Sequence, residues 1–303
     1  MKIFLTGASG MLATEVALKL EAQGHTVIQT DARPRLPQIS VLDITEQKKV
    51  QADISKAKPD YVFHLAAETD VDLCEQKPDH AYRVNTLGTE NIALACQQFD
   101  IPMLYISTAG VFGGEKKEPY TEFDIPNPAN VYGHSKLQGE IVVRNLLSKY
   151  FIIRAGWMVG GWEIDKKFVY KIVTQLREGK KELRVVSDKW GSPTFTKDFA
   201  DNVLNVVNTR RYGLYHMTNK GCATRYEIAR KIVEFMGLKE DVKINAISSD
   251  AFPLPAPRAR SEMMINYKLE LLGLNNMPYW EESLATYIKT HTQPQVAHSG
   301  SAC

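Results

Sequence analysis

A tyrosine and a lysine stand four residues apart in the middle of the chain, in Tyr132-Gly133-His134-Ser135-Lys136. On a helix, residues at this spacing lie on one face, so the lysine ammonium can reach the phenol or a group bound beside it. A free phenol, with a pKa of about 10, is a slow acid at neutral pH, and a neighbouring cation lowers that value. The pair therefore predicts a proton donor with its own cation, although solvated surface pairs have the same spacing.

A hydroxyl residue precedes that helix at the end of a predicted strand. The apolar run Met103–Ser107 is typical of a buried strand, and Thr108 stands at its carboxyl end. Open parallel sheets bind their ligands beyond the carboxyl ends of the strands. A proline-rich stretch, 119–128, then leads into the helix of Tyr132.

The beginning of the chain has the pattern of a strand, a glycine turn and a helix. The apolar run Lys2–Thr6 is followed by Gly7-Ala8-Ser9-Gly10, and apolar residues then recur at helical spacing. Gly7 permits a tight turn, Gly10 lets the backbone approach a pyrophosphate, and the helix N-terminus supplies amide donors. Ala13 stands where a third glycine is usual. We therefore predict a dinucleotide site, the alternative being an ordinary turn between strand and helix.

Charged residues after the second predicted strand bear on the choice of cofactor. This strand, 26–30, ends at Asp31, about twenty residues past the glycines, where an acid can bind the ribose 2′-hydroxyl of NAD and repel the 2′-phosphate of NADP. Arg33 and Arg35 follow, and two cations could receive that phosphate. The sequence favours NAD(H) slightly and allows NADP(H). Asp43-Ile44 could frame the adenine, or Asp43 could be a turn acid.

A third strand and a long helix complete the predicted cofactor side. The strand Pro59–Leu65 is followed by the small-residue loop Ala66-Ala67-Glu68-Thr69, which leaves room for a cofactor. The helix is expected from Asp79 to Phe99, and Asn85 within it could fix backbone carbonyls near the catalytic helix or be a plain helix asparagine. Strands that alternate with helices at this spacing predict an α/β fold, a Rossmann-like doubly wound parallel sheet.

Composition excludes several classes of protein. The 303 residues carry 37 Lys and Arg against 35 Asp and Glu, without long runs of either sign, so neither nucleic acid nor an anionic membrane is an expected partner. No stretch approaches the ~20 apolar residues of a membrane span. The four cysteines are widely spaced and form no CxxC pair, which argues against a zinc site and a disulfide scaffold. We expect a cytoplasmic location, a small-molecule partner and no metal.

The composition shifts after the strand Phe151–Arg154 and the glycine pair Gly160-Gly161. Helical patterns alternate there with short strands and loops, as a smaller C-terminal α/β lobe over the cofactor would require. We expect a Rossmann domain over 1–155, a mainly substrate-binding lobe over 156–290 with segments returning to the first domain, and a flexible tail over 291–303.

The combination of glycine turn, strand-end hydroxyl and Tyr-x-x-x-Lys resembles the extended short-chain dehydrogenase/reductases, and within them the dTDP-4-dehydrorhamnose reductase family. The resemblance covers about residues 1–289. The matching segments are Gly7-x-x-Gly10, Ala66-Ala67-Glu68-Thr69-Asp70-Val71-Asp72, Ile106-Ser107-Thr108, Asn130–Glu140, Gly191–Asp198 and Pro257-Arg258-Ala259-Arg260. It implies reduction of the C4 ketone of a nucleotide-linked 4-keto-6-deoxy sugar by NAD(P)H, and it leaves a homodimer possible.

The resemblance also implies roles for particular residues. Tyr132 would be the general acid, Lys136 would lower its pKa and hold the nicotinamide ribose, and Thr108 would donate a hydrogen bond to the carbonyl oxygen. The expected cofactor contacts are Gly7, Ser9, Gly10, Met11, Leu12, Asp31, Arg33, Asp43, Ile44, Leu65, Ala66, Ala67, Thr69, Asn85, Tyr132 and Lys136. The expected substrate contacts are Val71, Thr108, Ala109, Trp157, Arg258 and Arg260, the arginines as partners of the phosphates.

The chain also departs from the reductase pattern. Ala109-Gly110 and Gly113 stand where an Asp-Tyr pair and an Asp are usual, so a side-chain wall near the sugar is missing, and Ile265 replaces a usual acid. Dehydratases of this superfamily place Asp-Glu after the catalytic threonine, so Ala109-Gly110 disfavour dehydration. An epimerase that retains NAD, and a regulatory subunit like that of methionine adenosyltransferase, remain alternatives to the reductase.

Overall fold

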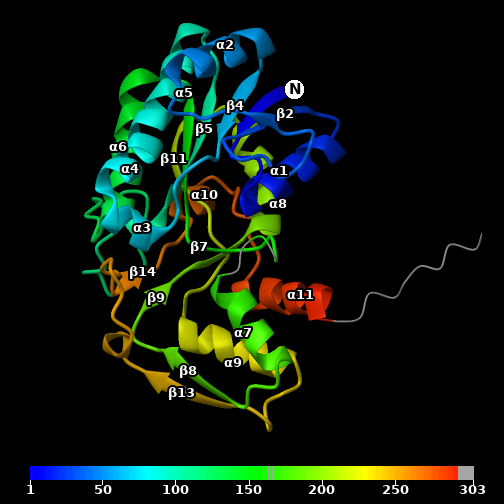
Figure 1. Ribbon diagram of the computed structural model, residues 1–303, viewed down its shortest axis with the longest axis vertical. Coiled ribbons are helices and arrows are strands. Elements are labelled where there is room, and N and C mark those ends of the chain that lie inside the picture. Colours follow the sequence, from blue (N-terminus) through cyan, green and yellow to red (C-terminus); the bar gives the residue numbers. More distant parts are fainter. Residues whose placement is uncertain (163, 165–166, 293–303) are drawn as a thin grey trace, which may run out of the picture.

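The computed structural model describes residues 1–162, 164 and 167–292, and it contains a seven-stranded sheet in the order β11-β6-β5-β4-β1-β2-β3 (Figure 1). Each neighbouring pair in this sheet is parallel. The central strands are almost entirely buried, as apolar strands covered on both faces should be. The strands are β1 (Lys2–Thr6), β2 (Thr26–Asp31), β3 (Ser40–Val41), β4 (Tyr61–His64), β5 (Met103–Thr108), β6 (Tyr150–Ala155) and β11 (Gly213–His216).

Helices cover both faces of the sheet, which confirms the predicted doubly wound fold. On one face α1 (Met11–Ala22) packs with α8 (Thr196–Val207). On the other lie α2 (Gln47–Ala57), α5 (Gly88–Gln98) and α6 (Val131–Leu146). Both α8 and β11 follow residue 155 in the chain, so segments beyond the first half return to the sheet.

The helix expected over Asp79 to Phe99 is present, but it is not uniform. The short helices α3 (Val71–Gln76) and α4 (Pro78–Tyr82) come first, and a π-helical segment, Arg83–Leu87, joins α4 to α5. Such segments are frequent at functional sites. Here the segment contains Asn85 and packs against α6.

Most of the remaining elements form a second lobe below the sheet in Figure 1, around a core of its own. Two strand pairs are parallel: β7 (Trp157–Val159) with β10 (Pro193–Phe195), and β8 (Glu182–Val186) with β13 (Lys243–Ile247). A third small sheet has β9 (Trp190–Gly191) between β12 (Ala223–Thr224) and β14 (Ser261–Glu262). The helices of this lobe are α7 (Phe168–Arg177), α9 (Arg225–Phe235) and α11 (Trp280–Thr292), with a 3-10 turn at Ser249–Ala251. Helix α10 (Tyr267–Leu271) packs against β11 in the core of the main sheet, and a second 3-10 turn, Ala109–Val111, follows β5.

The end of the described chain differs from the expected tail. Residues 291 and 292 belong to α11, whose apolar face packs into the second lobe, so the expected tail begins too early. Residues 293–303 lie outside the described part of the chain. Among the described helices, none combines the length and apolar character that crossing a bilayer requires.

Candidate active site

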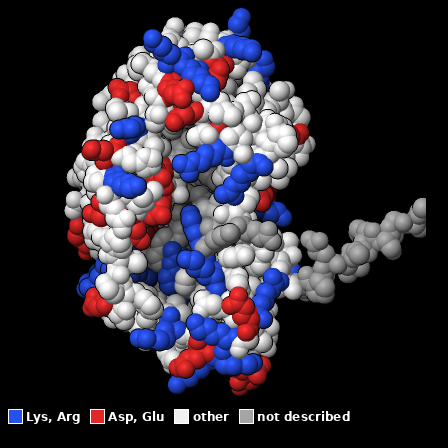
Figure 2. All heavy atoms as spheres, viewed as in Figure 1, with Lys and Arg blue, Asp and Glu red and all other residues white. Residues whose placement is uncertain are grey.

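A cavity of about 1420 Å³ separates the carboxyl ends of the sheet strands from the second lobe, and both contribute to its wall. This volume exceeds the roughly 300–1,000 Å³ of a pocket for one small ligand. Figure 2 shows the hollow and the Lys and Arg side chains that gather around it. The residues that line the cavity include Arg33, Lys189 and Arg258. The cavity can therefore hold two ligands side by side, and its charge favours anions.

The glycine turn after β1 forms one end of the cavity. Gly7 has a φ of 72°, and a Cβ there would lie 2.7 Å from the Ala66 backbone, so a side chain is excluded. The Gly10 amide donates to the Gly7 carbonyl at 2.9 Å and α1 begins at Met11. No side chain caps this helix N-terminus, which leaves its amides available to an anion. The turn therefore fits the pyrophosphate of a dinucleotide.

Asp31 at the end of β2 is occupied by backbone donors. Its Oδ2 accepts from the Ser9 amide at 3.0 Å and its Oδ1 from the Arg33 amide at 2.8 Å. The Ser9 hydroxyl accepts in turn from the Arg35 amide at 3.1 Å. The carboxylate thus shapes the loop, while the exposed side chains of Arg33 and Arg35 line the mouth of the cavity.

Asn85 lies behind the cavity wall rather than in it. Its Oδ1 accepts from the Glu68 amide at 2.8 Å, and its Nδ2 donates to the Glu68 carbonyl at 3.1 Å and to Ser135 Oγ at 3.0 Å. The side chain is 1% exposed. Asn85 is not among the residues that line the cavity, and its assignment as a cofactor contact stays a prediction. Its hydrogen bonds join the loop after β4 to the catalytic helix, the other role weighed from the sequence.

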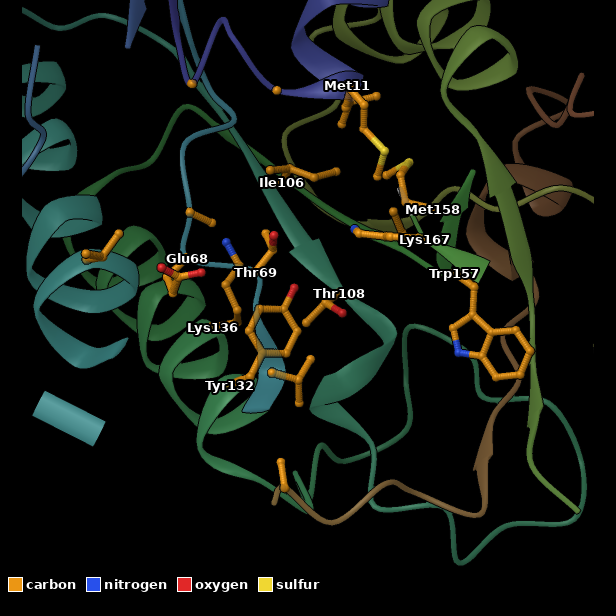
Figure 3. A pocket seen from close by; sticks show the side chains of 18 of the residues that line it. Met11, Glu68, Thr69, Ile106, Thr108, Tyr132, Lys136, Trp157, Met158 and Lys167 are labelled. Carbon is orange, nitrogen blue, oxygen red and sulfur yellow. The ribbon is translucent and has the colours of Figure 1, made fainter. Parts of the chain in front are cut away.

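The catalytic helix is seated directly on the turn that follows β5. The N-cap side chain of Asn130 accepts from the Gly133 amide at 2.9 Å and starts α6. Gly133 allows the helix to touch this turn, because a Cβ there would lie 2.0 Å from the Gly110 carbonyl oxygen. Thr108 Oγ1 accepts from the Gly110 amide at 3.0 Å and shares a hydrogen bond with the Tyr132 side chain. Figure 3 shows Tyr132, Thr108 and Lys136 side by side in the cavity.

Burial changes the pKa of both Tyr132 and Lys136. Burial raises the pKa of Tyr132 to about 12, and the Thr108 hydrogen bond opposes that change. Burial lowers the pKa of Lys136 to about 7, and the Glu140 carboxylate opposes that change. The Lys136 Nζ lies 4.2 Å from the centroid of the Tyr105 ring and has no hydrogen-bond partner among the described residues.

The opposite wall comes from the second lobe. Trp157 Nε1 donates to Glu262 Oε2 at 2.6 Å, and the Arg225 guanidinium lies 3.8 Å from the Trp157 ring centroid. Burial raises the pKa of Glu262, while Trp157 and Arg225 oppose that change. Arg258 is paired with Asp72 at 2.9 Å across the two lobes. Sequence reasoning missed Glu262 and Arg225, which no motif marks.

Most of the predicted contacts share this single cavity. Its lining includes Gly7, Ser9, Gly10, Met11, Leu12, Asp31, Arg33, Asp43, Ile44, Leu65, Ala66, Ala67, Thr69, Val71, Thr108, Tyr132, Lys136, Trp157 and Arg258. Ala109 is outside it, because the 3-10 turn buries this residue against Val111 and Phe112. Arg260 is also outside it, with its side chain exposed and its carbonyl accepting from the Trp190 amide. The structure does not bring these two residues into the cavity, and their assignments as substrate contacts stay predictions.

Comparisons with known proteins give a consistent result. Residues 1–293 match the family model described as RmlD substrate binding domain. The spore coat polysaccharide biosynthesis protein SpsK of Bacillus subtilis is 33% identical over 95% of the chain and 97% of its own length. The dTDP-4-dehydrorhamnose reductase of Mycolicibacterium smegmatis is also 33% identical, over 93% of the chain and 84% of its own length.

Two solved structures are similar throughout. A dTDP-4-dehydrorhamnose reductase from Clostridium acetobutylicum is 39% identical with a TM-score of 0.89, over 96% of the chain and 99% of the other. The enzyme of the same name from Bacillus anthracis, in complex with NADP, is 34% identical with a TM-score of 0.88, over 95% and 99%. The likeness to that family predicted from the sequence is therefore confirmed.

Proposed function

Because the chain belongs to the RmlD substrate binding domain family, we propose that it uses NADPH or NADH to reduce the C4 ketone of a nucleotide-linked 4-keto-6-deoxy sugar. The observation that carries this proposal is the meeting of Thr108, Tyr132 and Lys136 with the glycine turn of Gly7 and Gly10 in one cavity. The names of the similar reductases, and the NADP in one of their structures, support the reaction and the cofactor.

The side chains supply the proton and the electrostatics of this reaction. NAD(P)H supplies the hydride when bound. Tyr132 remains protonated at neutral pH, since its pKa is about 12, and it donates that proton to the C4 oxygen as negative charge develops there. The Thr108 hydroxyl donates a hydrogen bond to the same oxygen. The Lys136 ammonium stabilises the phenolate that Tyr132 leaves behind.

The geometry supports binding sites at the two ends of the cavity. The glycine turn, the loop 66–69 and the arginines at the mouth of the cavity would hold the dinucleotide. Arg33 and Arg35 would donate hydrogen bonds to a 2′-phosphate, because the Asp31 carboxylate is already bound to two backbone amides. Trp157 would pack on the sugar, and Arg258 would pair with the nucleotide diphosphate. For the other predicted residues that line the cavity, we propose the cofactor or substrate contacts that the sequence predicted.

The test is oxidation of NADPH and of NADH, followed by the loss of nicotinamide absorbance, with dTDP- and UDP-linked 4-keto-6-deoxy sugars. Loss of a positioned acid costs about 10²-fold or more, so turnover should fall by that factor in Tyr132→Phe. The variant should keep the melting temperature of the wild type and its affinity for NADPH. The proposal would be contradicted by a folded protein that binds NADPH but does not oxidise it in the presence of any of these keto sugars.

Three further predictions, on the domain boundaries, the cellular location and the oligomeric state, belong to this proposal. We propose a Rossmann domain over 1–155 and a mainly substrate-binding lobe over 156–290 with segments that return to the first domain, supported by the separate core of the second lobe. A cytoplasmic location is supported by the free thiols of Cys74, Cys96 and Cys222. A homodimer is supported by exposed apolar side chains, including Phe123 and Ile125.

A further inference from the structure

A third ionisable side chain shares the face of α6 that carries the catalytic pair. Tyr132, Lys136 and Glu140 follow one another at intervals of four residues, one helical turn each. Glu140 has no exposed surface and Lys136 only 2%. A buried carboxylate therefore stands one turn below the buried ammonium, on the side away from Tyr132.

Glu140 joins the helix to two strands of the sheet. Its Oε1 accepts from Ser107 Oγ at 2.6 Å and from Arg154 Nε at 2.8 Å, and its Oε2 accepts from Arg154 Nη2 at 2.7 Å. Ser107 on β5 and Arg154 on β6 are register partners, and Ser107 directly precedes Thr108. One carboxylate thus fixes the catalytic helix against the strand end that carries the catalytic threonine.

The ammonium of Lys136 lies in surroundings that disfavour its charge. A buried cation without a hydrogen-bond partner tends to lose its proton, and the Tyr105 ring below it offers only a weak cation–π contact. The titratable groups around Lys136 and Tyr132, besides Glu140, are Tyr105 on β5, His64 on β4, Cys74 on α3, Glu68 in the loop after β4 and Glu262 on β14 of the second lobe.

None of these other groups supplies the anion that a buried lysine needs. Burial and the Lys136 charge lower the pKa of His64 to about 3, so this ring is neutral. The pKa of Tyr105 lies well above its ordinary value because the ring is buried. Glu68, Glu262 and Cys74 act on Tyr132, whereas Glu140 is the carboxylate that raises the Lys136 pKa.

We propose that Glu140, held in place by its ion pair with Arg154, is a positioning residue that keeps Lys136 a cation and fixes the catalytic helix against Ser107. Arg154 compensates the charge of this buried carboxylate through two hydrogen bonds. Glu140 acts through Lys136 and Ser107 and touches no substrate. The inference rests on the proposed function, in which the Lys136 charge assists the acid Tyr132.

The test removes both buried charges together, because Glu140→Gln alone leaves Arg154 unpaired and destabilises the fold. Replacing a buried ion pair by uncharged side chains is often tolerated, so the double variant Glu140→Gln/Arg154→Met is expected to fold. Two pH profiles are measured: kcat/KM for the keto sugar, and NADPH affinity from the fluorescence of the bound nicotinamide. Both should fall in the wild type as Lys136 loses its proton near pH 7.

In the double variant the Glu140 carboxylate no longer raises the Lys136 pKa. The pH midpoints at which kcat/KM and NADPH affinity fall should therefore be lower by about one unit or more. At a fixed alkaline pH this is a loss of roughly tenfold, and acidification should restore the activity. Glu140→Asp keeps the charge and should keep the wild-type midpoints. The matched control is Glu122→Gln, which removes another buried carboxylate, one bound to the amides of His216 and Lys268, and it should leave both midpoints unchanged.

A folded double variant with unchanged midpoints would overturn the inference, as would an equal shift in Glu122→Gln. Failure of the proposed function is a separate result. In that case the wild-type protein would bind NADPH but would not oxidise it in the presence of any keto sugar. The pH midpoint of NADPH binding would still test the role of Glu140 in that protein.

Discussion

Replacing Gly133 by alanine should separate the catalytic helix from the turn that carries Thr108. The new methyl group would lie 2.0 Å from the Gly110 carbonyl oxygen and 3.0 Å from the Pro128 side chain. Carbon and oxygen atoms normally approach to no less than about 3.3 Å, so helix and turn must move apart by roughly 1.3 Å. The Tyr132–Thr108 hydrogen bond spans this junction and would break.

A displacement of about 1 Å between reacting groups can cost 10²-fold in rate, so kcat/KM should fall by about that factor. The effect on stability should be smaller, because the higher helix propensity of alanine, about 0.5–1 kcal/mol, offsets part of a packing cost of about 1–3 kcal/mol.

The assay measures kcat/KM by NADPH oxidation and the melting temperature by circular dichroism. The control is Gln138→Ala, at a half-buried position on the same helix, which adds no atom to this junction. A Gly133→Ala protein with wild-type kcat/KM would refute the claim that this contact sets the geometry of the acid.

Other consequences can be measured independently. The double variant Arg33→Ala/Arg35→Ala should lose roughly tenfold in NADPH affinity, measured by nicotinamide fluorescence, because charge-assisted bonds to the 2′-phosphate disappear; an equal loss for NADH would contradict this role. Asn85→Ala should lower the free energy of unfolding by about 1–3 kcal/mol, since it leaves the buried Glu68 amide unpaired; urea denaturation measures this, and an unchanged midpoint would contradict it. Because the pKa of His64 is about 3 when folded and about 6.5 when unfolded, the unfolded chain binds the proton first, and stability should fall as pH drops from about 6.5 by roughly 1.4 kcal/mol per unit. Urea unfolding at about pH 7 and pH 5 tests this, and His64→Gln should reduce the dependence.

The sequence was sufficient to predict the fold and the strand ends, because these depend on local patterns. Gly7, Thr108 and Tyr132 lie where short motifs predict them, since each motif includes the strand or helix that orients it. Ala109 and Arg260 stand next to true cavity residues, and only the backbone direction in the folded chain shows that they point elsewhere.

Contacts between distant segments could not be predicted in this way. Trp157 and Glu262 are more than a hundred residues apart and meet through one hydrogen bond. The pKa of Tyr132 could not be predicted from the motif either, because it depends on how deeply the ring is buried in the folded chain. Spacing along one helix indicates that a cation is near, but it does not give the desolvation of either group.

The order of strands in the main sheet has a consequence for synthesis on the ribosome. Six of its seven strands come from the first 155 residues, whereas β11, Gly213–His216, is added beside β6 nearly sixty residues later. Until β11 emerges, the apolar strand Tyr150–Ala155 is an open sheet edge, which can pair with other chains. A nascent chain stalled between these strands should therefore need a chaperone to remain unaggregated, and this need should end once residue 216 has left the exit tunnel.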